Sequence, residues 1–295
     1  MSQVEGPDPS RQAVLVISSH VVRGSVGNRA VVFALETLGH PVWALPTVVL
    51  PWHPGHGPST RVALPQEGFS AIIDDLCRAP WLPEVGAIHS GYLAGAEQAA
   101  DVARLVAALR DRNPDALYLC DPVIGDAGGL YVPDETACAI RDTLLPLASI
   151  TTPNRFELLW LAGATGDDNA QLLQAAVQLG CERVVITSAV AMMAASTGNL
   201  LLTPRDAFLA EHRTIANPPN GTGDLLAALF LAHILTGKSD EQALHIATAS
   251  VFELLARTAR HGGDELALER EAASLKRPFA QVNMRRLIHP AGRKK

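Results

Sequence analysis

The chain has 295 residues, of which 48% are hydrophobic, and this is enough apolar material for the large core of an α/β domain. The formal net charge is −6 and the sequence pI is about 5.9, which excludes a broadly basic surface for nucleic acid or an anionic membrane. The basic residues that do cluster lie near the C-terminus and indicate a solvated tail: Arg285, Arg286, Arg293, Lys294 and Lys295.

The cysteines show neither a CxxC pair nor the spacing of zinc ligands, which favours reduced thiols in a cytoplasmic protein. They are Cys77, Cys120, Cys138 and Cys181. Residues 1–12 are polar and lack the apolar segment of a signal peptide, so we expect a flexible tail there. No apolar stretch reaches the roughly 18 residues that a membrane-spanning helix needs.

Apolar runs and helical periodicity alternate along the chain. In order, they predict a strand at 13–19, a helix at 28–38, a strand at 42–45, a proline- and glycine-rich loop at 47–68, a helix at 69–78, a strand at 85–89, a helix at 96–110 and a strand at 117–121. The pattern continues with a helix at 134–144, a strand at 150–152, helices at 156–161 and 170–179, a strand at 183–187, two or three antiparallel strands within 192–216 that turn at Gly198-Asn199, and helices at 221–235 and 241–259.

This alternation predicts a single α/β domain over residues 13–283, with residues 284–295 as a basic tail. The central sheet is expected to be doubly wound and mostly parallel, with helices on both faces. Ligands of such sheets bind beyond the carboxyl ends of the strands. Polar residues follow the predicted strands at these ends: Ser19-His20, Thr47, Ser90-Gly91-Tyr92, Asp121, Thr152-Pro153-Asn154 and Thr187-Ser188.

The segment Asn220-Gly221-Thr222-Gly223-Asp224 opens an apolar helix. Two glycines allow a ligand to approach the backbone closely, and the first amides of a helix favour negative charge. This combination indicates an anion site for a transferring phosphoryl group, with Asp224 placed to accept a proton from an attacking hydroxyl. On this motif alone, Asp224 is equally well explained as an ordinary acid in the first turn of a helix.

Two further carboxylates are candidate Mg²⁺ ligands. Asp121 ends a buried strand, where a carboxylate is costly unless it meets a cation or donors, and Mg²⁺ prefers one or two carboxylates beside phosphates and water. Glu157 begins a helix three residues after Asn154 and is the second candidate. Alternatively, Asp121-Pro122 forms a turn, Glu157 complements the helix dipole, and Thr187-Ser188 is a plain turn.

Several other chemistries are disfavoured. There is no GxxxxGK[ST] phosphate loop and no HExxH zinc arrangement. Ser19 and His20 are adjacent on an extended segment and point in opposite directions, so they do not form a nucleophile and its base.

The chain resembles the pyridoxal kinases of the ribokinase superfamily. The matching stretches keep the order of that family from about residue 13 to about residue 260: residues 17–24, 26–30, 91–93, 113–114, 121–126, 130–135, 152–158, 184–188 and 221–228. The resemblance implies a ribokinase-like fold and ATP-dependent phosphorylation of the 5′-hydroxymethyl group of pyridoxal, pyridoxine or pyridoxamine by direct in-line transfer. It also implies a homodimer.

The resemblance also implies residue roles. Asp224 would be the base, Gly221, Thr222 and Gly223 would form the anion hole, and Asp121 and Glu157 would organise Mg²⁺ and ATP. The nucleotide phosphates, with a monovalent cation such as K⁺, would be lined by Asp126, Tyr131, Thr152, Thr187 and Ser188. The substrate ring would face Ser19, Thr47 and Tyr92, under a loop that contains His53, Pro54 and Gly55.

The substrate loop departs from the family pattern. The family commonly has Asn-Thr-Val-Gln-Phe-Ser-Asn-His-Thr where residues 46–54 read Pro-Thr-Val-Val-Leu-Pro-Trp-His-Pro. Ser18 replaces a glutamine, and His56 replaces an aromatic residue. Trp52 is explained either as a stacking partner for the ring or as an anchor of the loop. Two alternatives therefore stay open: a kinase for another hydroxymethyl heterocycle such as hydroxymethylpyrimidine, and a catalytically silent protein that binds nucleotide or pyridoxal phosphate.

Overall fold

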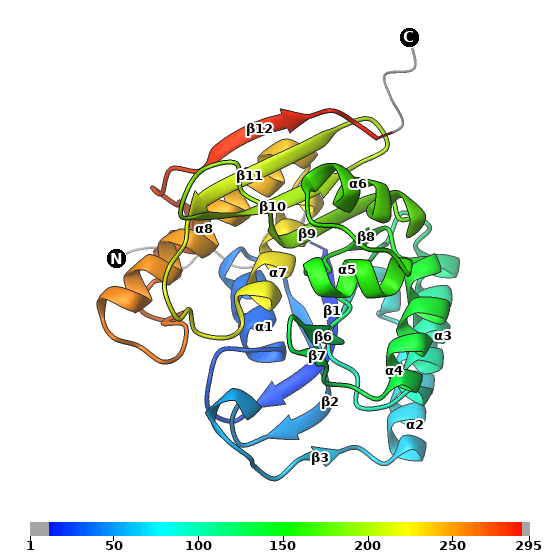
Figure 1. Cartoon of the computed structure of the whole chain (residues 1–295). Helices are drawn as coiled ribbons and strands as arrows, with labels where there is room; N and C mark the ends of the chain where they lie inside the picture. Colours follow the sequence, from blue (N-terminus) through cyan, green and yellow to red (C-terminus); the bar gives the residue numbers. More distant parts are fainter. Residues whose placement is uncertain (1–11, 291–295) are drawn as a thin grey trace, which may run out of the picture.

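A computed structural model describes residues 12–290 and shows the predicted doubly wound sheet (Figure 1). Ten strands form it, in the order β12-β11-β10-β9-β8-β5-β4-β1-β2-β3. The strands are β1 Ala13–Val21, β2 Val42–Leu50, β3 Val62–Ala63, β4 Val85–Ser90, β5 Leu117–Cys120, β8 Ile150–Thr151, β9 Arg183–Ala189, β10 Ser196–Leu202, β11 Ala207–Arg213 and β12 Asn283–Leu287. Pairings from β2 to β9 are parallel, and those at the two edges are antiparallel.

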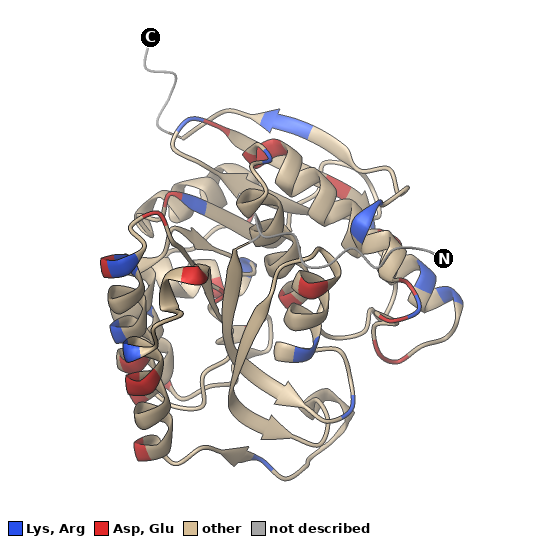
Figure 2. Ribbon diagram, turned by 180° about the vertical axis from the view of Figure 1, so that it is seen from behind, with Lys and Arg blue, Asp and Glu red and all other residues tan. Residues whose placement is uncertain are grey.

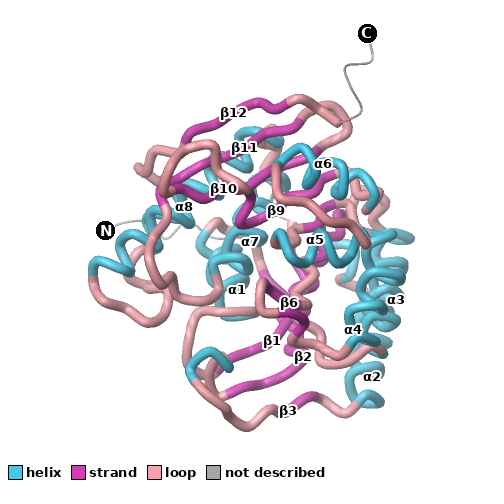
Figure 3. The backbone as a smooth tube through the Cα atoms, viewed as in Figure 1, coloured by secondary structure: helices cyan, strands magenta, loops and turns pink. Residues whose placement is uncertain are grey.

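Helices cover both faces of the sheet, as the tube view makes clear (Figure 3). Val14 and Val16 of β1 pack with α1, α7 and α8, while Leu15 and Ile17 face the opposite layer, as the alternation of side chains along a strand requires. The first layer holds α1 Asn28–Thr37, α7 Thr222–Leu235, α8 Asp240–Arg260 and α9 Ala272–Lys276; the second holds α2 Gln66–Arg78, α3 Glu97–Arg112, α4 Asp134–Ala139, α5 Arg155–Ala162 and α6 Asn169–Gln178.

Helix α7 is the central helix of the first layer. Nine consecutive residues from Leu225 to His233 are buried, and all but the last are apolar. A helix that is apolar on all sides is stable only inside a protein, so the sequence of α7 dictates its burial. The packing fixes the direction of the helix and therefore the place of its N-terminus.

The order of the strands reverses beside β1. The chain passes from β1 to β2 on one side and then returns to β4 on the other side of β1. Such a switch point opens a crevice at the carboxyl ends of the strands. The ends of β1, β4 and β5 and the start of α7 meet there.

The C-terminal assignment from sequence was wrong in part. Residues 283–287 form β12, which pairs with β11, so the tail cannot begin at residue 284. Arg285 pairs with Glu211 at 2.6 Å, and Arg286 pairs with Asp206. These two arginines therefore form ion pairs that hold β12 at the edge of the sheet. The run of basic residues in the sequence does not by itself reveal this role. The predicted tail at residues 1–12 falls almost wholly on residues 1–11, outside the described residues, as do residues 291–295.

Two local predictions also need correction. Gly198-Asn199 lies inside β10, and the connection to β11 is instead at residues 203–206, where the Thr203 hydroxyl accepts from the Asp206 amide at 3.0 Å. The predicted loop at 47–68 begins later, because β2 continues to Leu50 through Pro46. Pairing of β2 with β1 is irregular between Ser18 and His20, and such a register shift tolerates a proline.

Both acidic and basic residues occur along α2 and α3 (Figure 2). Arg104 of α3 reaches Asp74 of α2 at 2.5 Å and Asp101 of its own helix at 2.6 Å. Within residues 12–290, no helix combines the length and the apolar character needed to cross a membrane.

Candidate active site

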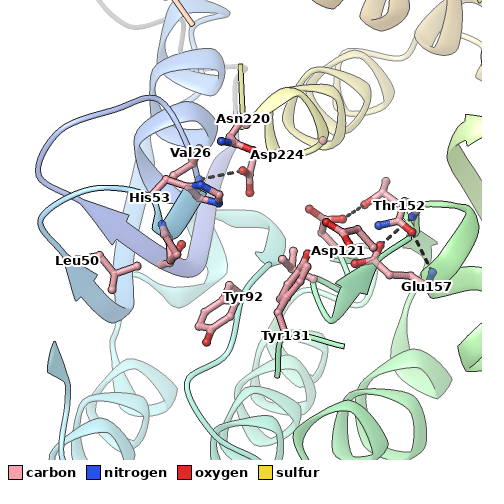
Figure 4. A pocket seen from close by; sticks show the side chains of 18 of the residues that line it. Val26, Leu50, His53, Tyr92, Asp121, Tyr131, Thr152, Glu157, Asn220 and Asp224 are labelled. Carbon is pink, nitrogen blue, oxygen red and sulfur yellow. Dashed lines mark hydrogen bonds between the residues drawn. The ribbon is translucent and has the colours of Figure 1, made fainter. Parts of the chain in front are cut away.

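A pocket of about 460 Å³ opens at the switch point (Figure 4). It brings together thirteen of the residues predicted from the sequence: Ser19, His53, Pro54, Tyr92, Asp121, Asp126, Tyr131, Thr152, Glu157, Thr187, Gly221, Gly223 and Asp224. They come from strands and loops spread over most of the chain, so their convergence is a result of the fold and not of local sequence.

The N-terminus of α7 points into this pocket. Gly221 precedes the first helical residue with φ 93°, a left-handed conformation that favours glycine, and no side chain caps the helix start. A Cβ at Gly221 would collide with the carbonyl oxygen of Ser25, whereas one at Gly223 would meet open space. The uncapped first-turn amides and the helix dipole make this end suitable for an anion.

Asp224 stands on the first turn of α7 and projects into the pocket (Figure 4). Its Oδ2 accepts a hydrogen bond from the Gly27 amide at 3.0 Å, and no described residue donates to Oδ1. Burial raises the pKa of Asp224 to about 6, and the Gly27 amide opposes this shift. The carboxylate is thus ionised at neutral pH and has a pKa suited to taking up a proton.

Asp121 lies at the end of β5 with 6% of its surface exposed. Its Oδ1 accepts from the Thr152 hydroxyl at 2.7 Å. Burial raises its pKa well above the usual value, and the charges of Asp224 and Glu157 raise it further. The four carboxylates that line this pocket, Asp121, Asp126, Glu157 and Asp224, repel one another, so the site favours a bound cation. Among residues 12–290, however, no cluster of three or more side chains is arranged to hold a metal by itself.

Glu157 has a structural role that the sequence offered only as an alternative. Its Oε2 accepts from the Asn154 amide at 2.8 Å and its Oε1 from the Ile124 amide at 3.0 Å, while the Asn154 side chain caps the Glu157 amide. Glu157 therefore completes the capping box of α5 and holds the segment that follows Asp121. Burial raises its pKa to about 7, against the effect of these amides.

Two residues predicted to bind the substrate, one facing its ring and one in the covering loop, lie outside the pocket lining. Thr47 is fully buried, and its hydroxyl donates to the Tyr92 carbonyl at 2.7 Å, so the threonine positions Tyr92 instead of facing a ligand. Gly55 donates its amide to Nδ1 of His53 at 3.0 Å, and a Cβ there would press against His53 and Asn220. Gly55 therefore shapes the turn that presents His53.

The phosphomethylpyrimidine kinase family model matches residues 70–268. Pyridoxal kinase PdxY of Corynebacterium diphtheriae is 33% identical over 287 residues, which are 93% of this chain and 99% of that protein. Pyridoxal kinase PdxY of Rubrobacter xylanophilus is 35% identical, over 93% and 97% of the two chains. The chain belongs to the pyridoxal kinase family. Pyridoxal kinase from Leishmania donovani, in complex with ADP and pyridoxamine, has a TM-score of 0.88 and 29% identity over 94% of this chain and 99% of its own. The predicted ribokinase-like fold is thereby confirmed.

The segment predicted to cover the substrate departs from the resembled pattern within residues 46–54 and at His56, and the turn that follows β2 is braced internally. Nε1 of Trp52 donates to the Gly57 carbonyl at 3.1 Å, and the His56 amide donates to the His53 carbonyl at 2.9 Å. Trp52 keeps 37% of its surface exposed and does not line the pocket. Its observed contact is that of a loop anchor.

A second pocket of about 300 Å³ adjoins the first and shares Thr187 and Gly223 with it. It contains the two other predicted residues, Ser188 and Thr222. The rest of its lining was not predicted: Thr197, Asn199, His212, Thr214, Ile215, Pro218, Leu226, Val251, Phe252 and Leu255. The rings of His212 and Phe252 stack at 4.6 Å between centroids. No motif marks these positions, because they come from β10, β11, the loop that follows β11, α7 and α8.

In the main pocket, Arg61 was not predicted from the sequence, and neither were the apolar residues Val26, Leu50 and Val123. Arg61 donates to the Ala94 carbonyl at 3.0 Å. Apart from Arg61, the only basic side chain in that lining is His53, whose pKa is lowered by burial. Gly27 and Asn220 also line the pocket, and both could have been chosen from sequence because they lie inside stretches already singled out.

Proposed function

We propose that this chain transfers the γ-phosphoryl group of ATP to the 5′-hydroxymethyl group of pyridoxal, pyridoxine or pyridoxamine. The observation that carries the proposal is the position of Asp224 at the tip of α7, in one pocket with Asp121 and Thr152. Membership of the pyridoxal kinase family supports the choice of substrate. A silent binding protein would have no need of a free carboxylate oxygen beside an uncapped helix start.

The chemistry requires little beyond positioning and charge stabilisation. Oδ1 of Asp224 takes the proton of the substrate hydroxyl while Gly27 holds Oδ2. The hydroxyl oxygen forms a bond to the γ-phosphorus, the bond from that phosphorus to the bridging oxygen breaks, and ADP leaves with the electron pair. The first amides of α7, from Thr222 onward, stabilise the negative charge on the transferring group.

The two adjoining pockets suggest how ATP lies. The alcohol occupies the end of the main pocket near Ser19 and Tyr92, and the phosphates lie along Thr152 and Thr187. The nucleobase then occupies the second pocket, next to the stacked rings of His212 and Phe252. Thr187 and Gly223 line both pockets, so the phosphate chain crosses from one pocket to the other beside these residues, with the γ-phosphate directed toward Asp224.

The carboxylates fit a Mg²⁺ ion that is bound mainly through phosphate oxygens and water. Asp121 would hold it directly or through water, with Glu157 behind, because both are buried, both have raised pKa values and neither has a described cationic partner. When bound, Mg²⁺ would neutralise charge on the phosphates. We extend the proposal to K⁺ beside the phosphates and to a homodimer, on the family resemblance. Activity with and without K⁺ and a molar mass measured by light scattering test these two points.

The decisive experiment is ATP-dependent formation of the 5′-phosphate of each vitamer with the purified chain: pyridoxal 5′-phosphate from pyridoxal, followed by absorbance, and the corresponding 5′-phosphates from pyridoxine and pyridoxamine, followed by the ADP released. We expect turnover with at least one of the three vitamers and a requirement for Mg²⁺. Hydroxymethylpyrimidine is the competing substrate, because residues 46–54 depart from the resembled pattern and the matching family model is that of a kinase for a related pyrimidine, phosphomethylpyrimidine. Turnover of the pyrimidine with none of the vitamers would overturn the assignment and keep the phosphotransfer chemistry.

A further inference from the structure

Glu265 lies outside both pockets but contacts the two segments that border the alcohol end of the main pocket. Its Oε2 accepts from the Ser25 amide at 3.1 Å, and its Oε1 accepts from Nε2 of His56 at 2.8 Å. Arg23 lies 3.6 Å from the same carboxylate. Each oxygen thus serves a different segment: one the loop between β1 and α1, the other the turn that carries His53.

The segment that bears Glu265 is itself firmly held. Leu266 and Leu268 are buried in the core beside α1, α7 and α8, and the Thr258 hydroxyl accepts from the Ala267 amide at 3.2 Å. Only 14% of the Glu265 side chain is exposed. The carboxylate is therefore pre-placed by the core and does not depend on the loops that it contacts.

The loop held by Glu265 leads directly to the base. The Ser25 hydroxyl donates to the Leu266 carbonyl at 2.8 Å, which adds a second tie to the same segment. Two residues after Ser25, the Gly27 amide donates to Asp224 (Figure 4). The carbonyl of Ser25 itself packs against Gly221 at the start of α7. Displacement of residues 23–27 would thus disturb both the base and the anion site.

The turn held by His56 leads to the alcohol side of the pocket. His53 lines that pocket, and its orientation is fixed by the turn that residues 53–57 form. Because Glu265 accepts the proton on Nε2, the contact needs no charged imidazole and works with a neutral ring that carries its proton there. His56 stands where the family commonly has an aromatic residue, so this tie belongs to the altered substrate loop.

We propose that Glu265 is a positioning residue of the reaction, which joins the substrate loop to the loop that orients Asp224. The proposal rests on the kinase function proposed above. The two hydrogen bonds of Glu265 predict different kinetic effects. The bond from His56 acts on binding of the alcohol, and the bond from Ser25 acts on the base. Loss of the first raises KM for the alcohol, and loss of both also lowers kcat.

The test compares Glu265→Met, Glu265→Gln, His56→Ala and Asp264→Asn with the wild-type chain. We expect E265M to raise KM for the alcohol and to lower kcat, each by about tenfold, as for loss of hydrogen bonds to a charged group. H56A should raise only KM, and E265Q, which keeps one acceptor, should lie between E265M and the wild type. KM for ATP should stay within about twofold in H56A, because the turn of residues 53–57 contributes to the main pocket and not to the second pocket.

Asp264 supplies the matched control. It is the neighbouring carboxylate, it pairs with Arg23 at 2.7 Å on the surface, and it contacts neither Ser25 nor His56. D264N should therefore retain the kinetics of the wild type. Hydrogen exchange of the amides of residues 52–57 gives a readout without turnover, and it should accelerate in H56A and E265M but not in D264N.

An error in the role of Glu265 can be told apart from an error in the proposed substrate. Each variant is compared with the wild type on whichever alcohol the wild type phosphorylates. Wild-type KM, kcat and exchange rates in folded H56A and E265M would overturn the positioning role. A lower melting temperature in E265M without any change in KM would overturn it as well. If E265M does not fold, H56A and E265Q decide, since His56 lies on a surface turn whose loss leaves the core intact.

Discussion

The two ends of the main pocket differ in how closely they follow the pyridoxal kinase family. At the phosphate end, Asp121, Thr152 and the start of α7 all come from intact motifs and stand on strands and helices of the core. At the proposed alcohol end, the chain departs from the resembled pattern within residues 46–54 and at His56, and the turn around His53 is held by contacts of its own: Trp52 with Gly57 and His56 with Glu265. We infer that phosphoryl transfer tolerates little change in the charged residues of the phosphate end. The sequence of the alcohol end can change as long as other hydrogen bonds hold its turn in place.

This contrast predicts the largest loss for a change at the base. Asp224→Asn keeps the shape of the side chain but removes the proton acceptor, and loss of a general base costs about 10²–10⁴-fold in rate. We expect kcat to fall by that order while the affinity for ATP, measured by calorimetry, stays within a few-fold. A D224N variant with near wild-type kcat would show that Asp224 is not the base.

The base should also impose an acid limb on the pH profile. The pKa of Asp224 is raised to about 6, and the residue works in its ionised form, so kcat/KM should be flat above that pH and fall about tenfold per unit below it. Asp121 and Glu157 line the same pocket and their pKa values are also raised, so these carboxylates contribute to the same limb, whereas Tyr131 stays neutral across this range.

His53 is the competing source of such a limb. Burial lowers its pKa, and it lines the pocket near the alcohol. His53→Gln separates the two groups: the limb should persist in H53Q, with a lower overall rate, if Asp224 produces it. Disappearance of the limb in H53Q would assign it to the histidine.

A smaller effect is expected at the capping box of α5. Glu157→Gln leaves one acceptor for three backbone amides, and we expect KM for ATP and Mg²⁺ to rise about tenfold, as for loss of hydrogen bonds to a charged group. Asp168→Ala is the matched control, because Asp168 forms the capping box of α6 on the surface, away from both pockets. D168A should lower the melting temperature and leave the kinetics unchanged. Equal kinetic effects in E157Q and D168A would show that Glu157 acts only as part of the cap of α5.

Much of the phosphate end could be predicted from the sequence, because its residues follow strands whose apolar runs are unmistakable. Asp121 and Thr152 end neighbouring parallel strands, and the fold then brings them together without further information. The second pocket could not be predicted, since His212 and Phe252 lie on a strand and a helix that nothing local relates. The tie between His56 and Glu265 spans 209 residues and joins two loops, so only the fold reveals it.

The same limit explains the misassigned C-terminus. Arg285 and its neighbours are basic and polar, and in isolation they are typical of a tail. They form a strand only because β11 offers an unpaired edge and Glu211 a buried partner. Thr47 shows the converse error, since a hydroxyl at the end of a predicted strand was taken for a ligand contact and instead holds the Tyr92 backbone.

The smallest effect is expected at Trp52, and it distinguishes the two explanations of this residue. As a loop anchor, Trp52 contributes its indole N–H to the Gly57 carbonyl; as a ring partner, it would contribute its aromatic face. Trp52→Phe keeps the face and removes the donor, while Trp52→Ala removes both. Because the observed contact is the hydrogen bond, both variants should raise KM for the alcohol by a similar factor, about threefold, and leave kcat and KM for ATP unchanged. A W52F variant that binds the alcohol as well as the wild type, beside a weakened W52A, would instead mean that the side chain turns toward the substrate when the pocket fills.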